Sequence, residues 1–208
     1  MFHFSQPFQG VVRHLVIINV LAFLAANILL GDMTRTSLGM MEFAAWPPSS
    51  GLFQPYQILT YMFLHDPSNI LHLGFNMLML WMFGSMVEAA WGPKRFLFFY
   101  LFCGVGSLVY HFFIQSYLQE QAGPLLGASG AIYGVLIAFA YLYPDLELRL
   151  LFLPIPIKAK YLALGLLALD IFRGFSGSQS QTAHFAHAGG AFFGFLLLLF
   201  WYKGRTRV

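Results

Sequence analysis

Six apolar stretches of roughly membrane-spanning length run along the chain, and more polar segments separate them. They cover residues 11–30, 68–87, 96–117, 128–143, 159–175 and 183–202. A helix needs about 20 predominantly apolar residues to cross the hydrocarbon core of a bilayer. The pattern therefore predicts an all-α, polytopic membrane protein with six transmembrane helices. The fifth stretch is the weakest of the six, because Lys158 and Lys160 lie near its start.

Two of the connecting segments carry more information than the others. The run "LRLLFLPIPI" (148–157), before the fifth stretch, is itself apolar but contains Pro154 and Pro156. Proline removes a backbone donor and clashes inside a helix, so we expect a loop there. The long connection 31–56 has few charges and several large apolar residues. It is typical of an outer segment that lies in the membrane interface.

Composition places the chain in lipid rather than in water. Of its 208 residues, 59% are hydrophobic and 9% are charged, and the mean hydropathy is +0.70. A soluble domain carries about 25% charged residues, so lipid must cover much of this surface. The net charge of +3 is too small for a nucleic-acid-binding stripe. We expect a single membrane domain over 1–208, with a core at about 53–202, and a bilayer but no nucleic acid as partner.

The basic residues predict the orientation of the chain. With six spans, both termini lie on one side of the membrane. That side holds nine of the 11 Lys and Arg residues, and the other side holds Arg35 and Arg173. Loops on the cytoplasmic side are enriched in Lys and Arg. We therefore expect a multi-pass protein of the cell membrane with both termini in the cytoplasm.

The fourth apolar stretch is short and begins with a serine among glycines, in "LLGASGAIYG" (125–134). Residues 128–143 span about 24 Å as a helix, less than the roughly 30 Å of the hydrocarbon core. Ser129 therefore lies at a helix N-terminus below the outer water surface. The irregular backbone of 120–127 is tolerated at that depth only beside protein or a wet cavity. We expect Ser129 to open onto a water-filled depression.

A serine hydroxyl becomes a nucleophile only when a base takes its proton. The candidate bases within the apolar stretches are His72, His111, His184 and His187. Small residues spaced four apart let two membrane helices approach closely. Such stripes occur in the fourth and sixth stretches, as Gly130 and Gly134, with Gly127 three residues before them, and as Gly190 and Gly194. If they face each other, His187 meets Ser129 with no acidic residue in obvious attendance.

The second apolar stretch contains "HLGFN", in which His72 and Asn76 are four residues apart. Residues at this spacing lie on one face of a helix. Both side chains can donate hydrogen bonds, as an oxyanion requires. The backbone N–H of Ser129 adds a further donor at the positive end of its helix.

Three motifs in this order resemble the rhomboid intramembrane serine proteases. They are "HLGFN", "GASG" with Tyr133 four residues after the serine, and "AH" with glycines three and seven residues after His187. The resemblance extends from about Phe53 to Gly194 and includes the segment 53–100. Trp46 is followed by Pro47, whereas many bacterial members have a Trp-Arg pair in this first outer loop.

The resemblance implies a six-helix rhomboid-like bundle and a Ser–His dyad without an aspartate. It implies Ser129 as nucleophile, His187 as general base and Tyr133 packed on the imidazole ring. It also implies that His72, Asn76 and the Ser129 amide bind the oxyanion. The reaction is then hydrolysis of a peptide bond in or near the transmembrane segment of a protein substrate, with no cofactor.

Other interpretations stay open at this point. A non-catalytic relative would bind membrane proteins without cleaving them, and a small transporter would line a pathway with the same polar residues. His184 and His187 could suggest a metal, but no carboxylate adjoins them in the sequence and the HExxH motif is absent. We therefore expect no metal and place His184 at the outer interface. Asp170 is a weak candidate for a third catalytic residue.

Overall fold

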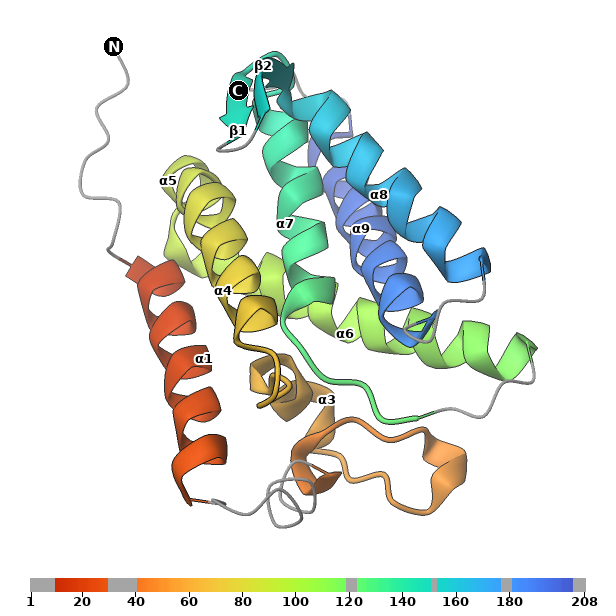
Figure 1. The fold of residues 1–208 in the computed structure, drawn as a ribbon. Coiled ribbons are helices and arrows are strands. Elements are labelled where there is room, and N and C mark those ends of the chain that lie inside the picture. Colours follow the sequence, from red (N-terminus) through yellow and green to blue (C-terminus); the bar gives the residue numbers. More distant parts are fainter. Residues whose placement is uncertain (1–9, 30–40, 119–122, 151–152, 177–180, 204–208) are drawn as a thin grey trace.

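The computed structural model describes residues 10–29, 41–118, 123–150, 153–176 and 181–203 of the chain. Long helices occur at all six expected places (Figure 1), so the predicted all-α architecture is confirmed. Their bounds are α1 Gly10–Leu29, the continuous segment α4 Ile70–Met79, η3 Leu80–Gly84 and α5 Ser85–Trp91, then α6 Pro93–Leu118, α7 Ser129–Leu142, α8 Ala159–Phe175 and α9 Gln181–Tyr202.

Short elements join the first two long helices on the side where α7 begins. They are the 3-10 turn η1 Pro48–Ser50, α3 Gln57–Thr60 and η2 Tyr61–Phe63. Asn69 then caps α4, because its side chain accepts a hydrogen bond from the His72 amide at 3.0 Å. Capping satisfies one of the donors that every helix start leaves free, and it fixes where α4 begins.

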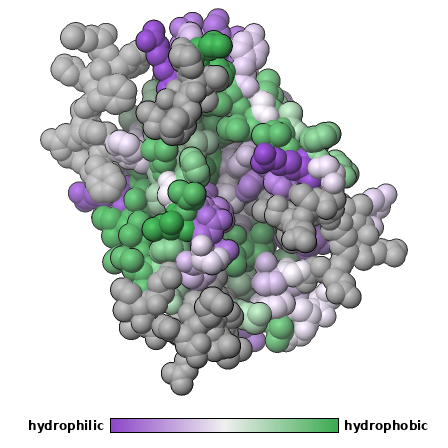
Figure 2. Space-filling view, viewed as in Figure 1, coloured by the Kyte–Doolittle hydropathy of each residue, from purple (hydrophilic) through white to green (hydrophobic). Residues whose placement is uncertain are grey.

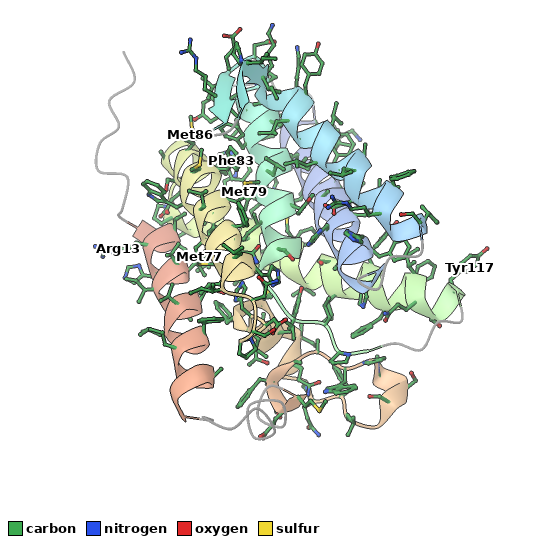
Figure 3. The ribbon with its side chains drawn as sticks, in the orientation of Figure 1. Arg13, Met77, Met79, Phe83, Met86 and Tyr117 are labelled. Atoms are coloured by element: carbon green, nitrogen blue, oxygen red, sulfur yellow. The ribbon has the colours of Figure 1, made fainter. Side chains whose placement is uncertain are left out.

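Helix α7 lies between α4 on one side and α8 and α9 on the other (Figure 1), and α6 also packs against it. Eight of its residues are buried, among them Ala131, Val135 and Phe139. Phe139 meets Phe83 of η3 with ring centroids 4.7 Å apart. Figure 3 labels Phe83 with Met77, Met79 and Met86 along the same continuous helix. A helix this apolar on all sides needs neighbours or lipid all around it.

The connection between α7 and α8 corrects one expectation. The residues predicted as a loop form an antiparallel pair, β1 Glu147–Leu150 and β2 Leu153–Lys158. Pro154 and Pro156 are compatible with β2 because a two-stranded sheet leaves one edge of each strand unpaired. Beside the hairpin, Lys160 donates a hydrogen bond to Asp145 at 2.8 Å. This contact lowers the pKa of the Asp145 carboxyl.

The described surface suits a bilayer. Three helical segments are long and apolar enough to cross one, namely Ile70–Trp91, Pro93–Tyr117 and His184–Tyr202. Gly10–Ala26 and Ser129–Leu142 are shorter apolar helices. Large apolar side chains such as Phe172 and Phe200 are 70% and 77% exposed. Figure 2 shows hydrophobic residues over much of the described surface in one view.

Candidate active site

Ser129 is the first residue of α7, as its place after a glycine-rich turn predicted. Gly127 has φ +117°, a conformation that residues with a side chain rarely adopt. The backbone before the helix is paired with other loops: Leu125 exchanges two hydrogen bonds with Ala45, and the Gly127 amide donates to the Tyr61 carbonyl at 2.9 Å. These contacts hold the irregular strand that delivers Ser129. Residues 31–40 of the expected interfacial segment lie outside the described residues.

The glycine stripes of α7 and α9 do face each other. A Cβ atom added to Gly190 would lie 1.8 Å from the carbonyl oxygen of Gly130, and one added to Gly194 would lie 3.0 Å from the Cα of Gly134. A Cβ on Gly130 would lie 3.4 Å from the Ala186 carbonyl oxygen. The backbone that carries Ser129 therefore packs directly on the turn of α9 that carries His187.

His187 is held from two directions. Its ring stacks on Tyr133 of α7, with centroids 4.4 Å apart and planes 7° apart. Its Nδ1 atom lies 3.1 Å from Oδ2 of Asp170 in α8. The other ring nitrogen, Nε2, is buried and has no hydrogen-bond partner among the described residues. The ring therefore has a fixed plane and one nitrogen uncommitted, which a general base requires. Catalytic hydrogen bonds are often long before substrate binds.

Asp170 is the residue that the sequence interpretation undervalued. Its carboxylate contacts three side chains: Nδ1 of His184 at 2.7 Å, Nδ1 of His187, and the hydroxyl of Tyr133. Asp170 is 6% exposed and His184 is 8% exposed. The expectation that His184 faces the outer interface is therefore wrong, and so is the expectation that no acidic residue attends His187. The carboxylate comes from the preceding helix, which packs on α9, so sequence adjacency could not reveal it.

One of the expected oxyanion donors, His72, lies near the serine. A Cβ atom added to Gly127 would lie 3.7 Å from Ser129 Oγ and 3.9 Å from His72 Nε2. The serine hydroxyl and the His72 ring therefore both lie close to Gly127. Asn76, one turn further along α4, is 6% exposed, and its Nδ2 donor has no partner among the described residues. His65 lies edge-on to the His72 ring, with centroids 5.5 Å apart. The fourth candidate base, His111, is fully buried in α6.

The fold and these contacts define a helical membrane protein in which Asp170, His184 and His187 meet between α7, α8 and α9, and in which Ser129 begins the helix that packs on α9. A family model of the rhomboid domain matches residues 52–204. The chain belongs to the rhomboid family. It is 35% identical to Rhomboid protein 1, mitochondrial, of Saccharomyces cerevisiae over 136 residues. These residues make up 65% of this chain and 38% of the yeast protein.

Two further relatives carry different names. The human presenilin-associated rhomboid-like protein, mitochondrial, is 30% identical over 187 residues, which is 89% of this chain and 47% of that protein. Rhomboid protease GluP of Bacillus subtilis is 35% identical over 141 residues, which is 67% of this chain and 25% of that protein. The chain thus spans less than half the length of these relatives. Together with the family match, they support a membrane protein.

Proposed function

We propose that this chain is an intramembrane serine endopeptidase that cleaves transmembrane segments of membrane proteins. The observation that carries the proposal is the fixed imidazole of His187 on the turn of α9 that packs against the start of α7. Its Nδ1 atom is hydrogen-bonded to Asp170, and its ring stacks on Tyr133. This leaves Nε2 as the atom that can take the proton of Ser129.

The proposed reaction follows from these roles. Ser129 Oγ attacks the scissile carbonyl carbon while its proton passes to His187 Nε2. The oxyanion that forms accepts hydrogen bonds from His72, Asn76 and the Ser129 amide, which are donors fixed before the reaction begins. His187 then returns the proton to the leaving amine, and water hydrolyses the acyl-enzyme by the same route. Besides this water molecule, the chain's own residues supply every group that the proposed steps require.

Asp170 adds a part that the expected dyad lacked. A carboxylate on Nδ1 holds the imidazole in the tautomer whose Nε2 is free to accept, and it stabilises the imidazolium that forms. Asp170 acts through His187 and does not touch the serine, so we assign it as a positioning residue. Tyr133 supports both groups, with its ring on His187 and its hydroxyl on Asp170.

The location and substrate belong to the same proposal. Ser129, His72 and His187 are each half-buried at the end of α7 where the helix begins. We propose that this site takes an extended segment of a substrate helix rather than an intact helix, because the amides of an intact helix are hydrogen-bonded. We propose that both termini share the side of the membrane that is rich in Lys and Arg, by the positive-inside rule. That side is cytoplasmic if the chain resides in a cell membrane. It is the matrix side if the chain resides in a mitochondrion, as the yeast and human relatives are named.

The test is covalent labelling of the purified protein in detergent by a fluorophosphonate, which reacts with an activated serine. We expect the wild-type chain to be labelled at Ser129 and the Ser129→Ala and His187→Ala variants to remain unlabelled. Ser107→Ala is the matched control. The Ser107 hydroxyl donates a hydrogen bond to the Ala186 carbonyl at 2.7 Å, so it is a structural serine that the reagent should not label. Labelling that survives Ser129→Ala, or its absence from a folded wild-type chain, would overturn the proposal.

A further inference from the structure

His184 is a buried histidine that the proposed reaction does not use. Its Nδ1 atom lies 2.7 Å from Oδ1 of Asp170, while His187 Nδ1 lies 3.1 Å from Oδ2 of the same carboxylate. One carboxylate orients His187 equally well without a second imidazole. The second imidazole on the Asp170 carboxylate therefore has no part in the proposed proton transfer.

The three side chains form a ligand set for a metal ion. One ligand atom from each of Asp170, His184 and His187 lies within 4.8 Å of the others. It is the one such group found among the described residues. Imidazole nitrogens with a carboxylate oxygen suit Zn²⁺ and neighbouring transition metals. Bonds of about 2.0–2.2 Å place tetrahedral ligands roughly 3.3 Å apart, so the present separations need only small side-chain shifts.

The surroundings of the cluster also suit a metal site. Tyr133 donates to the Asp170 carboxylate, as partners in the outer shell of metal sites commonly do. The side chains of His184 and His187 are 10% and 15% exposed, so the cluster is shielded without being sealed. A dication there meets one carboxylate and two neutral imidazoles. Arg173, one turn further along α8, adds a positive charge nearby that limits the affinity.

We propose that a divalent transition metal of the Zn²⁺ class binds Asp170, His184 and His187 and holds the enzyme inactive. A metal on Nδ1 of His187 displaces the proton from that nitrogen, so the one remaining ring proton lies on Nε2. That nitrogen then donates instead of accepting, and it cannot take the proton of Ser129. The inhibition rests on the proposed function, whereas the metal site itself does not.

Binding is tested first, on a chain that cannot react. Ser129→Ala protein, purified without a polyhistidine tag and reconstituted in detergent, is titrated with Co²⁺ and followed by visible d–d absorption, then competed with Zn²⁺. We expect one ion per chain. His184→Gln in the same background removes an imidazole ligand and keeps a donor for Asp170, so we expect affinity to fall by roughly tenfold or more. Absence of binding, or equal affinity in both proteins, would overturn the proposal.

Inhibition is tested next, by the rate of fluorophosphonate labelling in buffered Zn²⁺, each variant relative to its own metal-free rate. We expect the wild-type rate to fall and to recover with a chelator. His184→Gln should need roughly tenfold more Zn²⁺. His14→Gln changes an exposed histidine of α1 and should respond as wild type does. Protection by His65→Gln instead would assign inhibition to the His65–His72 pair and overturn the proposal.

The two tests separate the two proposals. Co²⁺ binding that depends on His184, together with a wild-type chain that no fluorophosphonate labels, retains the metal site and removes the protease assignment. Labelling that depends on Ser129, in a protein that binds no metal, retains the protease and removes the metal site.

Discussion

Helices α9 and α8 both reach the candidate active site, but they pack against α7 in different ways. Helix α9 meets α7 backbone to backbone, with Gly190 against Gly130 and Gly194 against Gly134. Helix α8 leaves most of its apolar side chains exposed, and Gly165 has nothing within 4 Å of an added Cβ. The Asp170 side chain of α8 makes polar contacts with both α7 and α9. It contacts Tyr133 of α7 and the two histidines of α9.

The difference indicates a division of labour. The α7–α9 contact fixes where Ser129 lies relative to His187. The glycines let the two helix backbones touch, and this contact sets the distance between the helices. Helix α8 contributes a single carboxylate that sets the tautomer and plane of the His187 ring. Damage to the first contact should therefore disrupt the fold and the chemistry together. Damage to the second should disrupt the chemistry alone.

The largest expected effect comes from Gly190→Ala. The added methyl group would lie 1.8 Å from the Gly130 carbonyl oxygen, which is backbone and cannot turn aside. We expect loss of fluorophosphonate labelling together with a clear fall in the apparent melting temperature, followed by tryptophan fluorescence in detergent.

The matched control is Gly74→Ala on α4, where an added Cβ meets nothing within 4 Å. It should retain both labelling and melting temperature. Normal labelling of Gly190→Ala would show that the close approach of α7 and α9 is not needed.

Asp170→Asn is expected to have the next largest effect. The amide keeps the size of the side chain but removes the charge that stabilises the imidazolium, and it can hold the wrong His187 tautomer. Loss of the orienting carboxylate in serine hydrolases lowers turnover by about 10⁴-fold. The resemblance to the rhomboid proteases implies a dyad that needs no aspartate, so we expect a smaller loss here, of roughly 10²-fold, within the range of general-base effects.

The measurement is the rate of cleavage of a single-span substrate in liposomes, with the melting temperature followed in parallel. A fall in rate without a comparable fall in melting temperature supports the positioning role. A fold that collapses with the charge would assign Asp170 to stability instead. A rate within threefold of wild type would remove Asp170 from the mechanism.

The contrast between the two helices also explains how far the sequence could predict this site. The glycine spacing in "GASGAIYG" and "AHAGGAFFG" is local, so it predicted both faces of the α7–α9 contact and the residues carried on them. Asp170 has no local pattern, since α8 must pack on α9 before its carboxylate reaches His187. The available signal was an acidic residue inside an apolar helix, which is usually functional. The hairpin of β1 and β2 was missed because its apolar run and prolines also fit a loop.

Tyr133→Phe should have a smaller effect than the loss of the carboxylate. The ring that stacks on His187 remains, and the hydroxyl that contacts Asp170 is removed. We expect a loss of about tenfold or less in the cleavage rate, since a net hydrogen bond contributes about 1 kcal/mol. Tyr133→Ala, which also removes the ring, should lose clearly more. Equal losses in the two variants would show that the hydroxyl alone matters and that stacking does not position His187.

Gly165→Ala should have the smallest effect, and of the opposite sign. Gly165 lies in the middle of α8, where an added Cβ meets nothing within 4 Å. A methyl group there restricts the unfolded backbone without touching a neighbour, so helix stability should rise by up to about 1 kcal/mol. We expect a slightly higher melting temperature and an unchanged cleavage rate. In contrast, Gly194→Ala places a Cβ 3.0 Å from the Gly134 Cα and should lower both. If Gly165→Ala lowered the rate as Gly194→Ala does, α8 would have to pack as tightly during catalysis as α9 does, and the division of labour would fail.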